Sequence, residues 1–196
     1  MIKYYTNREL SRFLIINLAK WKRWSREFLP PDPLGGMQSG YARQYSIDKA
    51  FTVFLGGYLV SDLKYSIPES KRILNDLEKW FKGTGFYLST DKKDEYQIKE
   101  KIKEYRILIE QNRNTNGNDP KFNYRIQGLL ERKRVNNYGS YGWNEKYIET
   151  MILNEKNKSN DELSHTRLLE ITKILEFFIK RVGLKKSIYR MFSGDT

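Results

Sequence analysis

The chain has 196 residues, of which 39% are hydrophobic, 14% aromatic and 31% charged, so it is too aromatic for a disordered protein and we expect two small folded units. It has no cysteine, which excludes disulfides and thiolate metal sites, and no apolar run approaches the roughly 20 residues that span a bilayer. Its first residues lack the apolar core of a signal peptide, and we therefore expect a cytoplasmic protein.

The formal net charge of +12 favours a polyanionic partner, because cations that bind phosphates release counterions. Up to Lys82 the chain has 14 basic and 8 acidic residues, and after it 22 and 16, so each part carries +6 and overall charge locates no site. A local cluster is more informative. Four cations gather in one predicted helix, ahead of its first acid: Lys20, Lys22, Arg23 and Arg26.

The chain begins with two predicted helices. Thr6 with Glu9 forms a capping box, which predicts a first helix from about Asn7 to Leu14. Asn17 is a suitable N-cap for the second helix, which must end before Pro30. Its apolar residues lie three apart with the cations between them: Leu18, Trp21 and Trp24.

A loop rich in turn formers, PPDPLGGMQSG, then leads into a short predicted strand, GYARQY. Ser46 is expected to cap a third helix, in which Gly56 and Gly57 cost about 1 kcal/mol each relative to alanine. The two glycines therefore indicate either close packing or an early end of that helix. Ser66 is expected to cap a fourth helix, with Pro68 in its first turn.

After Gly83 the pattern predicts an antiparallel sheet. The segment FNYRIQGLLER alternates between apolar and polar residues, and Tyr105–Ile109 and Lys146–Leu153 are similar. The tract NRNTNGNDPK between the first two strands is typical of a long hairpin loop. Ile98, Ile102, Tyr105 and Ile109 also fit helical spacing, although we favour a strand.

A helix is predicted again from Asp161 to Val182. Its apolar residues are spaced 3, 4, 3 and 4 apart: Leu168, Ile171, Leu175, Phe178 and Val182. The pattern covers only about two heptads, so a helix packed on the sheet and a dimer seam are both open interpretations.

The second helix is the first candidate for function. A recognition helix buries one face and presents donors and cations to the major groove. Leu18 and Trp21 are expected to be buried, which leaves five residues for DNA: Asn17, Lys20, Lys22, Arg23 and Arg26. The alternative interpretation is an ordinary helix with a solvated basic face.

The following loop and strand are a candidate wing, which would place donors on phosphates or in the minor groove. Arg43 and Gln44 are expected to do this, and Gln38 and Ser39 supply donors near the tip. Tyr45 is expected to pack in the core.

In this order of motifs the first 80 residues or so resemble the MerR family of winged-helix regulators. The matching segments are YTNRELSRFL, INLAKWKRWSREFLPP, ARQYS and KYSIPESKRIL. The chain departs from the family at Ile15, where glycine is usual, at Lys22, where arginine is usual, and at Ala42, where tyrosine is usual. The resemblance implies a dimer that binds an inverted repeat in double-stranded DNA. Excisionase-type proteins share this fold.

Little in the sequence favours catalysis or cofactor binding. The lone His165 lies at the start of the predicted last helix, where a capping or surface role is expected. A second basic cluster comprises Arg132, Lys133 and Arg134. We expect it to lie on a solvated edge and not to contact phosphate. For the NNYGSYGWN segment, which contains Trp143, two interpretations are open: a loop that closes the sheet, and the lining of a ligand pocket. We favour the loop.

The sequence thus predicts an α+β protein. Residues 1–82 would form a MerR-like winged helix-turn-helix domain, and residues 83–196 a small antiparallel sheet with a C-terminal helix that dimerises or senses a signal. The predicted function is sequence-specific DNA binding by a homodimeric transcriptional regulator, with a small-molecule effector left open. The alternatives are an excisionase-like architectural protein of a mobile element and a winged-helix protein-interaction module. No enzyme, metal or cofactor is predicted.

Overall fold

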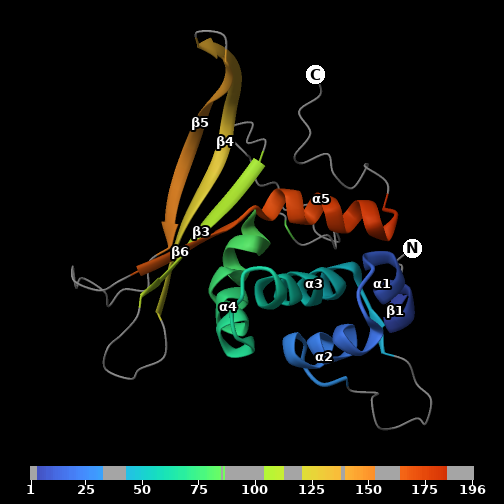
Figure 1. The fold of residues 1–196 in the computed structure, drawn as a ribbon. Helices are drawn as coiled ribbons and strands as arrows, with labels where there is room; N and C mark the ends of the chain where they lie inside the picture. The colour runs from blue at the N-terminus through green and yellow to red at the C-terminus, as the bar shows by residue number, and fades with distance from the viewer. Residues whose placement is uncertain are drawn as a thin grey trace. The chain divides into compact units, whose positions relative to one another are not determined.

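The computed structural model describes residues 4–32, 43–84, 86, 104–112, 121–137, 140–152 and 164–184. Helices and two antiparallel sheets make up this part of the chain, which confirms the predicted α+β class (Figure 1). The contacts divide the chain into two units. The first comprises Met1–Tyr96 with Leu175–Ile188, and the second Gln97–Ile174 with Tyr189–Thr196. The division predicted from the sequence differs from these units, because it placed the boundary at residue 82 and assigned residues 83–96 and 175–188 to the second part.

The elements of the first unit begin where the predicted caps place them. In chain order they are β1 (Tyr5–Thr6), α1 (Asn7–Leu14), α2 (Leu18–Phe28), β2 (Gln44–Tyr45), α3 (Ile47–Ser61) and α4 (Ile67–Gly83). Capping boxes close the N-termini of α1 and α4, where Thr6 pairs with Glu9 and Ser66 with Glu69. β1 and β2 pair antiparallel, Tyr5 opposite Tyr45. Of the strand predicted for GYARQY, only Gln44 and Tyr45 are in β2, and residues 33–42 lie outside the described part.

The two glycines of α3 lie where aromatic rings of α2 approach its backbone. A Cβ atom on Gly57 would come within 2.1 Å of the Trp24 ring, and one on Gly56 within 2.6 Å of the Phe28 ring. The helix continues through both to Ser61. Close packing is therefore the correct alternative of the two left open by the sequence, and the rings occupy the space that side chains would need.

Replacement of Gly57 by alanine tests this contact. Alanine gains about 1 kcal/mol of helix propensity, but here it must displace the buried Trp24 ring. We expect Gly57→Ala to lower the free energy of unfolding by about 1–3 kcal/mol in urea denaturation. Gly83→Ala is the control, because nothing lies within 4 Å of a Cβ there, and it should leave stability unchanged or raise it. Equal effects of the two changes would contradict the contact.

The last helix begins later than predicted. Ser164–Leu169 form a strand, β6, and only Ile171–Val182 form the helix, α5. The prediction of a helix from Asp161 was therefore wrong at its start, and His165 is an exposed residue of β6. Residues 161–163 lie outside the described part. β6 forms because the edge of strand β3 offers it a ladder of hydrogen bonds, which spacing along the chain does not reveal.

Phe178, in the apolar stripe of α5, is buried against α3. The ring of Phe178 lies 5.3 Å from that of Phe51 and 5.4 Å from that of Phe54, between ring centroids. Figure 1 shows α3 lying between α2 and α5. Leu168, by contrast, is 44% exposed in β6. At Phe178 the heptad pattern therefore marks a contact with α3 within the chain, while the dimer seam stays a prediction.

The turn between α1 and α2 contains a strained residue. Ile15 has φ of 57°, in the left-handed region that a β-branched side chain rarely adopts, and it is 72% exposed. Its own N–H group donates to the Arg12 carbonyl at 3.3 Å, which closes the end of α1.

Glycine at this position should relieve the strain. Because little apolar area is lost at an exposed site, we expect Ile15→Gly to raise the free energy of unfolding by about 0.5–1 kcal/mol, after the entropy gained by the unfolded chain is subtracted. Thermal denaturation of Ile15→Gly and Ile15→Ala measures this. An Ile15→Gly protein that melts below the Ile15→Ala protein would contradict the assignment of strain.

The second unit is built on a four-stranded antiparallel sheet, in the order β5-β4-β3-β6. Its strands are β3 (Glu104–Asn112), β4 (Lys121–Asn137), β5 (Ser140–Ile152) and β6. Strand was the correct choice for Tyr105–Ile109, and the strand predicted for FNYRIQGLLER is the first two thirds of β4. One face of the sheet is buried, with Ile107, Ile109, Tyr124 and Ile126 at 0–2% exposure. A bulge between Leu129 and Glu131 interrupts the register of β4 with β5.

Candidate nucleic-acid interface

Two opposed faces define α2. Its buried face comprises Trp21, Trp24 and Ser25, continued by the half-buried Phe28, at spacings of 3, 1 and 3. The same spacing shifted by two positions places four exposed residues on the opposite face: Ala19, Lys22, Arg23 and Arg26. We call these four the outer stripe. Ala19 was missed by the sequence analysis, although the spacing i, i+3, i+4, i+7 would have found it; its small side chain lets a partner approach the helix backbone closely.

Two of the predicted DNA-binding residues of α2 have other contacts. The side chain of Asn17 accepts hydrogen bonds from the N–H groups of Ala19, at 2.9 Å, and Lys20, at 3.3 Å, so its oxygen is used as the helix cap. Lys20 lies at the boundary between the two faces, with its ammonium nitrogen 4.8 Å from the centroid of the Trp24 ring. Lys22, Arg23 and Arg26 are thus the cations best placed for a phosphate or a base edge.

The first acid of the helix is paired away from the outer stripe. The carboxylate of Glu27 accepts a hydrogen bond at 2.8 Å from the ammonium group of Lys71 on α4. This hydrogen bond, and the charge of Lys71, lower the pKa of Glu27. Glu27 therefore stays ionised at neutral pH. Its hydrogen-bonded partner is Lys71, and its charge attracts Arg23 and Arg26 more weakly.

The candidate wing residues differ in their surroundings. The guanidinium of Arg43 donates to the carbonyl of Pro30 at 2.6 Å and lies 5.7 Å from the centroid of the Tyr45 ring. It therefore holds the end of α2 to β2, a role that the sequence did not predict. Gln44 is exposed in β2. Gln38 and Ser39 lie outside the described residues.

A buried hydroxyl joins three elements behind the outer stripe. The hydroxyl group of Tyr45 donates to the side-chain oxygen of Asn7 on α1 at 2.6 Å and lies 2.7 Å from the hydroxyl of Ser25 on α2. Tyr45 is fully buried, and this burial raises the pKa of its hydroxyl. The network fixes the angle between α1 and α2, because each partner would lose a buried hydrogen bond if either helix moved.

Removal of that hydroxyl should destabilise the first unit. Tyr45→Phe leaves the Ser25 hydroxyl, which is 3% exposed, without this partner, so we expect a loss of about 1–3 kcal/mol in unfolding free energy. Urea denaturation measures this loss. In the double variant Tyr45→Phe, Ser25→Ala, part of the stability should return, because the orphaned hydroxyl is gone. Additive losses would show that the two groups do not interact.

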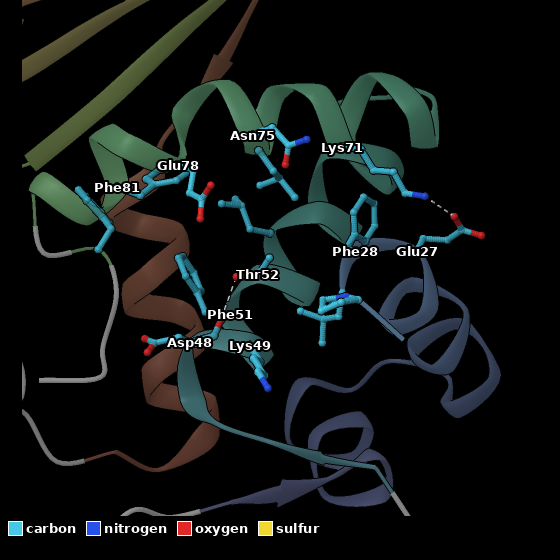
Figure 2. A pocket seen from close by; sticks show the side chains of 15 residues that line it. Glu27, Phe28, Asp48, Lys49, Phe51, Thr52, Lys71, Asn75, Glu78 and Phe81 are labelled. Atoms are coloured by element: carbon cyan, nitrogen blue, oxygen red, sulfur yellow. Dashed lines mark hydrogen bonds and ion pairs between the residues drawn. The ribbon is translucent and has the colours of Figure 1, made fainter. Parts of the chain in front are cut away.

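A pocket of about 540 Å³ opens between the end of α2, α3 and α4. Figure 2 shows Lys71 reaching from α4 to Glu27 at its edge. Four aromatic side chains contribute to its wall: Phe28, Phe51, Phe81 and Phe86. Its volume is within the range of small-molecule sites, and Glu27 and Phe28 belong to α2. A ligand there would contact the same helix that carries the outer stripe.

Two arginines on the exposed face of the sheet have hydrogen-bonded partners. Arg125 donates to Glu110 at 2.7 Å, and Arg106 donates to Gln127, which in turn donates to Glu149. The guanidinium of Arg106 also lies 4.0 Å from the centroid of the Tyr147 ring. This alternation of Arg and Glu leaves the face near neutral, in contrast to the outer stripe of α2.

Among the described residues, no group of three or more His, Asp or Glu side chains could hold a metal ion. No described helix combines the length and the apolar character required to cross a bilayer.

Comparisons with models of protein families, with curated proteins and with solved structures found no match for this chain.

Proposed function

We propose that the chain is a sequence-specific DNA-binding regulator whose first unit is a winged helix-turn-helix of the MerR type and which acts as a cytoplasmic homodimer. The observation that carries this proposal is the division of α2 into two faces. Trp21 and Trp24 are buried, whereas Lys22, Arg23 and Arg26 are exposed together with Ala19. A helix that reads the major groove needs this combination of a packed side and a cationic side with hydrogen-bond donors.

The surroundings of α2 support the same proposal. α1 and α2 are joined by a short turn at Ile15–Asn17, and the pairing of β1 with β2 places Gln44 on a strand that follows the loop. Arg43 ties that strand to the end of α2. This hydrogen bond keeps the strand beside the end of α2, so residues on both can be presented to one DNA duplex.

Two single substitutions, one on α2 and one on α4, test base readout. We expect Arg23→Ala to weaken binding to a cognate fragment selected from genomic DNA by about 5- to 100-fold, and binding to random DNA much less, since one base contact is worth roughly 1–3 kcal/mol. Lys79→Ala, an exposed cation on α4, is the charge-matched control and should change both only slightly. Equal losses of affinity for cognate and random DNA would count against base readout and would show that Arg23 contacts phosphates only.

The alternative functions give different results on the same fragments. One inverted repeat in a promoter supports the dimeric regulator, whereas tandem direct sites beside a recombination junction support an excisionase-like architectural protein. A gel shift without salt-sensitive binding to any genomic fragment would favour a protein-interaction module. A small-molecule effector stays a prediction, and the pocket beside Phe28 is large enough to hold one.

A further inference from the structure

The hairpin of β4 and β5 extends beyond the rest of the sheet. β3 pairs with β4 only as far as Leu129, whereas β5 continues to pair with it to Asn137 (Figure 1). We call residues 131–137 and 140–146 the ribbon. Its seven residue pairs span roughly 20 Å, and among the described residues no third strand pairs with them. A two-stranded ribbon has little core of its own, so a partner would stabilise it.

The base of the ribbon is anchored to the sheet. The guanidinium of Arg132 donates to both carboxylate oxygens of Glu104 on β3, at 3.1 and 3.2 Å, and to Glu145 at 2.7 Å. These carboxylates raise the pKa of Arg132 above its usual value. Arg132 therefore sets the direction in which the ribbon leaves the sheet, and its charge is already balanced.

The outer part of the ribbon exposes cations and one large aromatic ring. Trp143, which is 64% exposed, lies opposite Arg134 in the register. Lys133 and Lys146 are exposed on the other face, where Lys133 forms an ion pair with Glu131 at 2.8 Å. Both members of that pair are about half or more exposed, so a phosphate can replace the carboxylate at little cost.

The arrangement of these charges selects among partners. Four basic and two acidic residues lie in the ribbon, so two copies of it repel each other. Cations lie on both faces of the ribbon, which favours a partner with negative charge on both sides of it. Phosphates line both walls of a DNA groove, and the major groove is wide enough for a two-stranded ribbon.

We infer that the ribbon is a second contact of the chain with double-stranded DNA, in which Lys133, Arg134 and Lys146 bind phosphates and Trp143 contacts the groove. This inference rests on the proposed function, because it assigns the same partner to a separate surface. The ribbon makes sequence-independent contacts, and the outer stripe of α2 makes the base contacts.

Salt dependence separates the two surfaces. Three triple variants each remove three cations: K133A/R134A/K146A in the ribbon, K22A/R23A/R26A in the outer stripe, and K79A/K173A/K180A as the control. The probe is a labelled random-sequence duplex of about 30 base pairs, titrated by fluorescence anisotropy between about 50 and 200 mM salt. We expect the ribbon variant to reduce the slope of log Kd against log salt by about 2–3 relative to the control.

Tryptophan fluorescence reports the contact directly. Of the four tryptophans, Trp21 and Trp24 are buried, Trp80 is partly buried and Trp143 is mostly exposed. DNA should therefore change the emission of the unaltered protein, and Trp143→Phe should remove most of that change. The conservative replacement keeps the strand pairing intact, which circular dichroism verifies.

The results distinguish a failure of the ribbon inference from a failure of the proposed function. If the ribbon variant matches the control while the outer-stripe variant loses slope, or if Trp143→Phe keeps the full DNA-induced change, the inference is overturned and the proposed function stands. If the unaltered protein shows no salt-dependent binding, the proposed function fails with it. A Trp143 signal that depends on protein concentration without DNA overturns the inference in favour of a second copy of the chain.

Discussion

The packing of two aromatic rings onto two glycines determines what α2 can do. The Trp24 and Phe28 rings occupy the positions that Cβ atoms would have on Gly57 and Gly56, and this brings α2 close to α3. Two rings one turn apart on α2 fix both the rotation of this helix about its axis and its distance from α3. The outer stripe lies opposite those rings, so its exposure follows from the contact. The hydroxyl of Tyr45 fixes the angle between α1 and α2, because it donates to Asn7 on α1 and lies within hydrogen-bond distance of Ser25 on α2.

The chain carries +12, but the structure distributes its cations unequally between paired and exposed positions. On the exposed face of the sheet, Arg125 and Arg132 form ion pairs with glutamates, and such pairs contribute little attraction for a polyanion. On α2 the single nearby acid, Glu27, is paired with Lys71. Local pairing therefore distinguishes surfaces that the total charge of the two parts, +6 each, does not.

Features set by neighbours in the chain were predictable. The capping box of Thr6 with Glu9 and the cap at Ser66 marked helix starts correctly, because a cap involves only residues up to three apart. Features set by distant residues were not. The spacing of Leu168 with Ile171 fits a helix, yet Leu168 belongs to β6, whose pairing partner lies some sixty residues earlier in β3. In the candidate site, the cations of α2 were placed correctly on its exposed side, but the contact of Arg43 with the Pro30 carbonyl depends on how the loop returns.

The central claim is that the outer stripe of α2 faces DNA, and the absence of cysteine permits a direct test. A single cysteine at Lys20, on the boundary of the stripe, can carry an iron–EDTA reagent that cleaves nearby DNA, and a cysteine at Lys79 on α4 serves as the comparison. With a bound genomic fragment, the account predicts focused cleavage from position 20, within a few base pairs inside the protected site, and weak cleavage from position 79. Cleavage from position 20 no stronger than from position 79, on a fragment that both proteins bind, would contradict it.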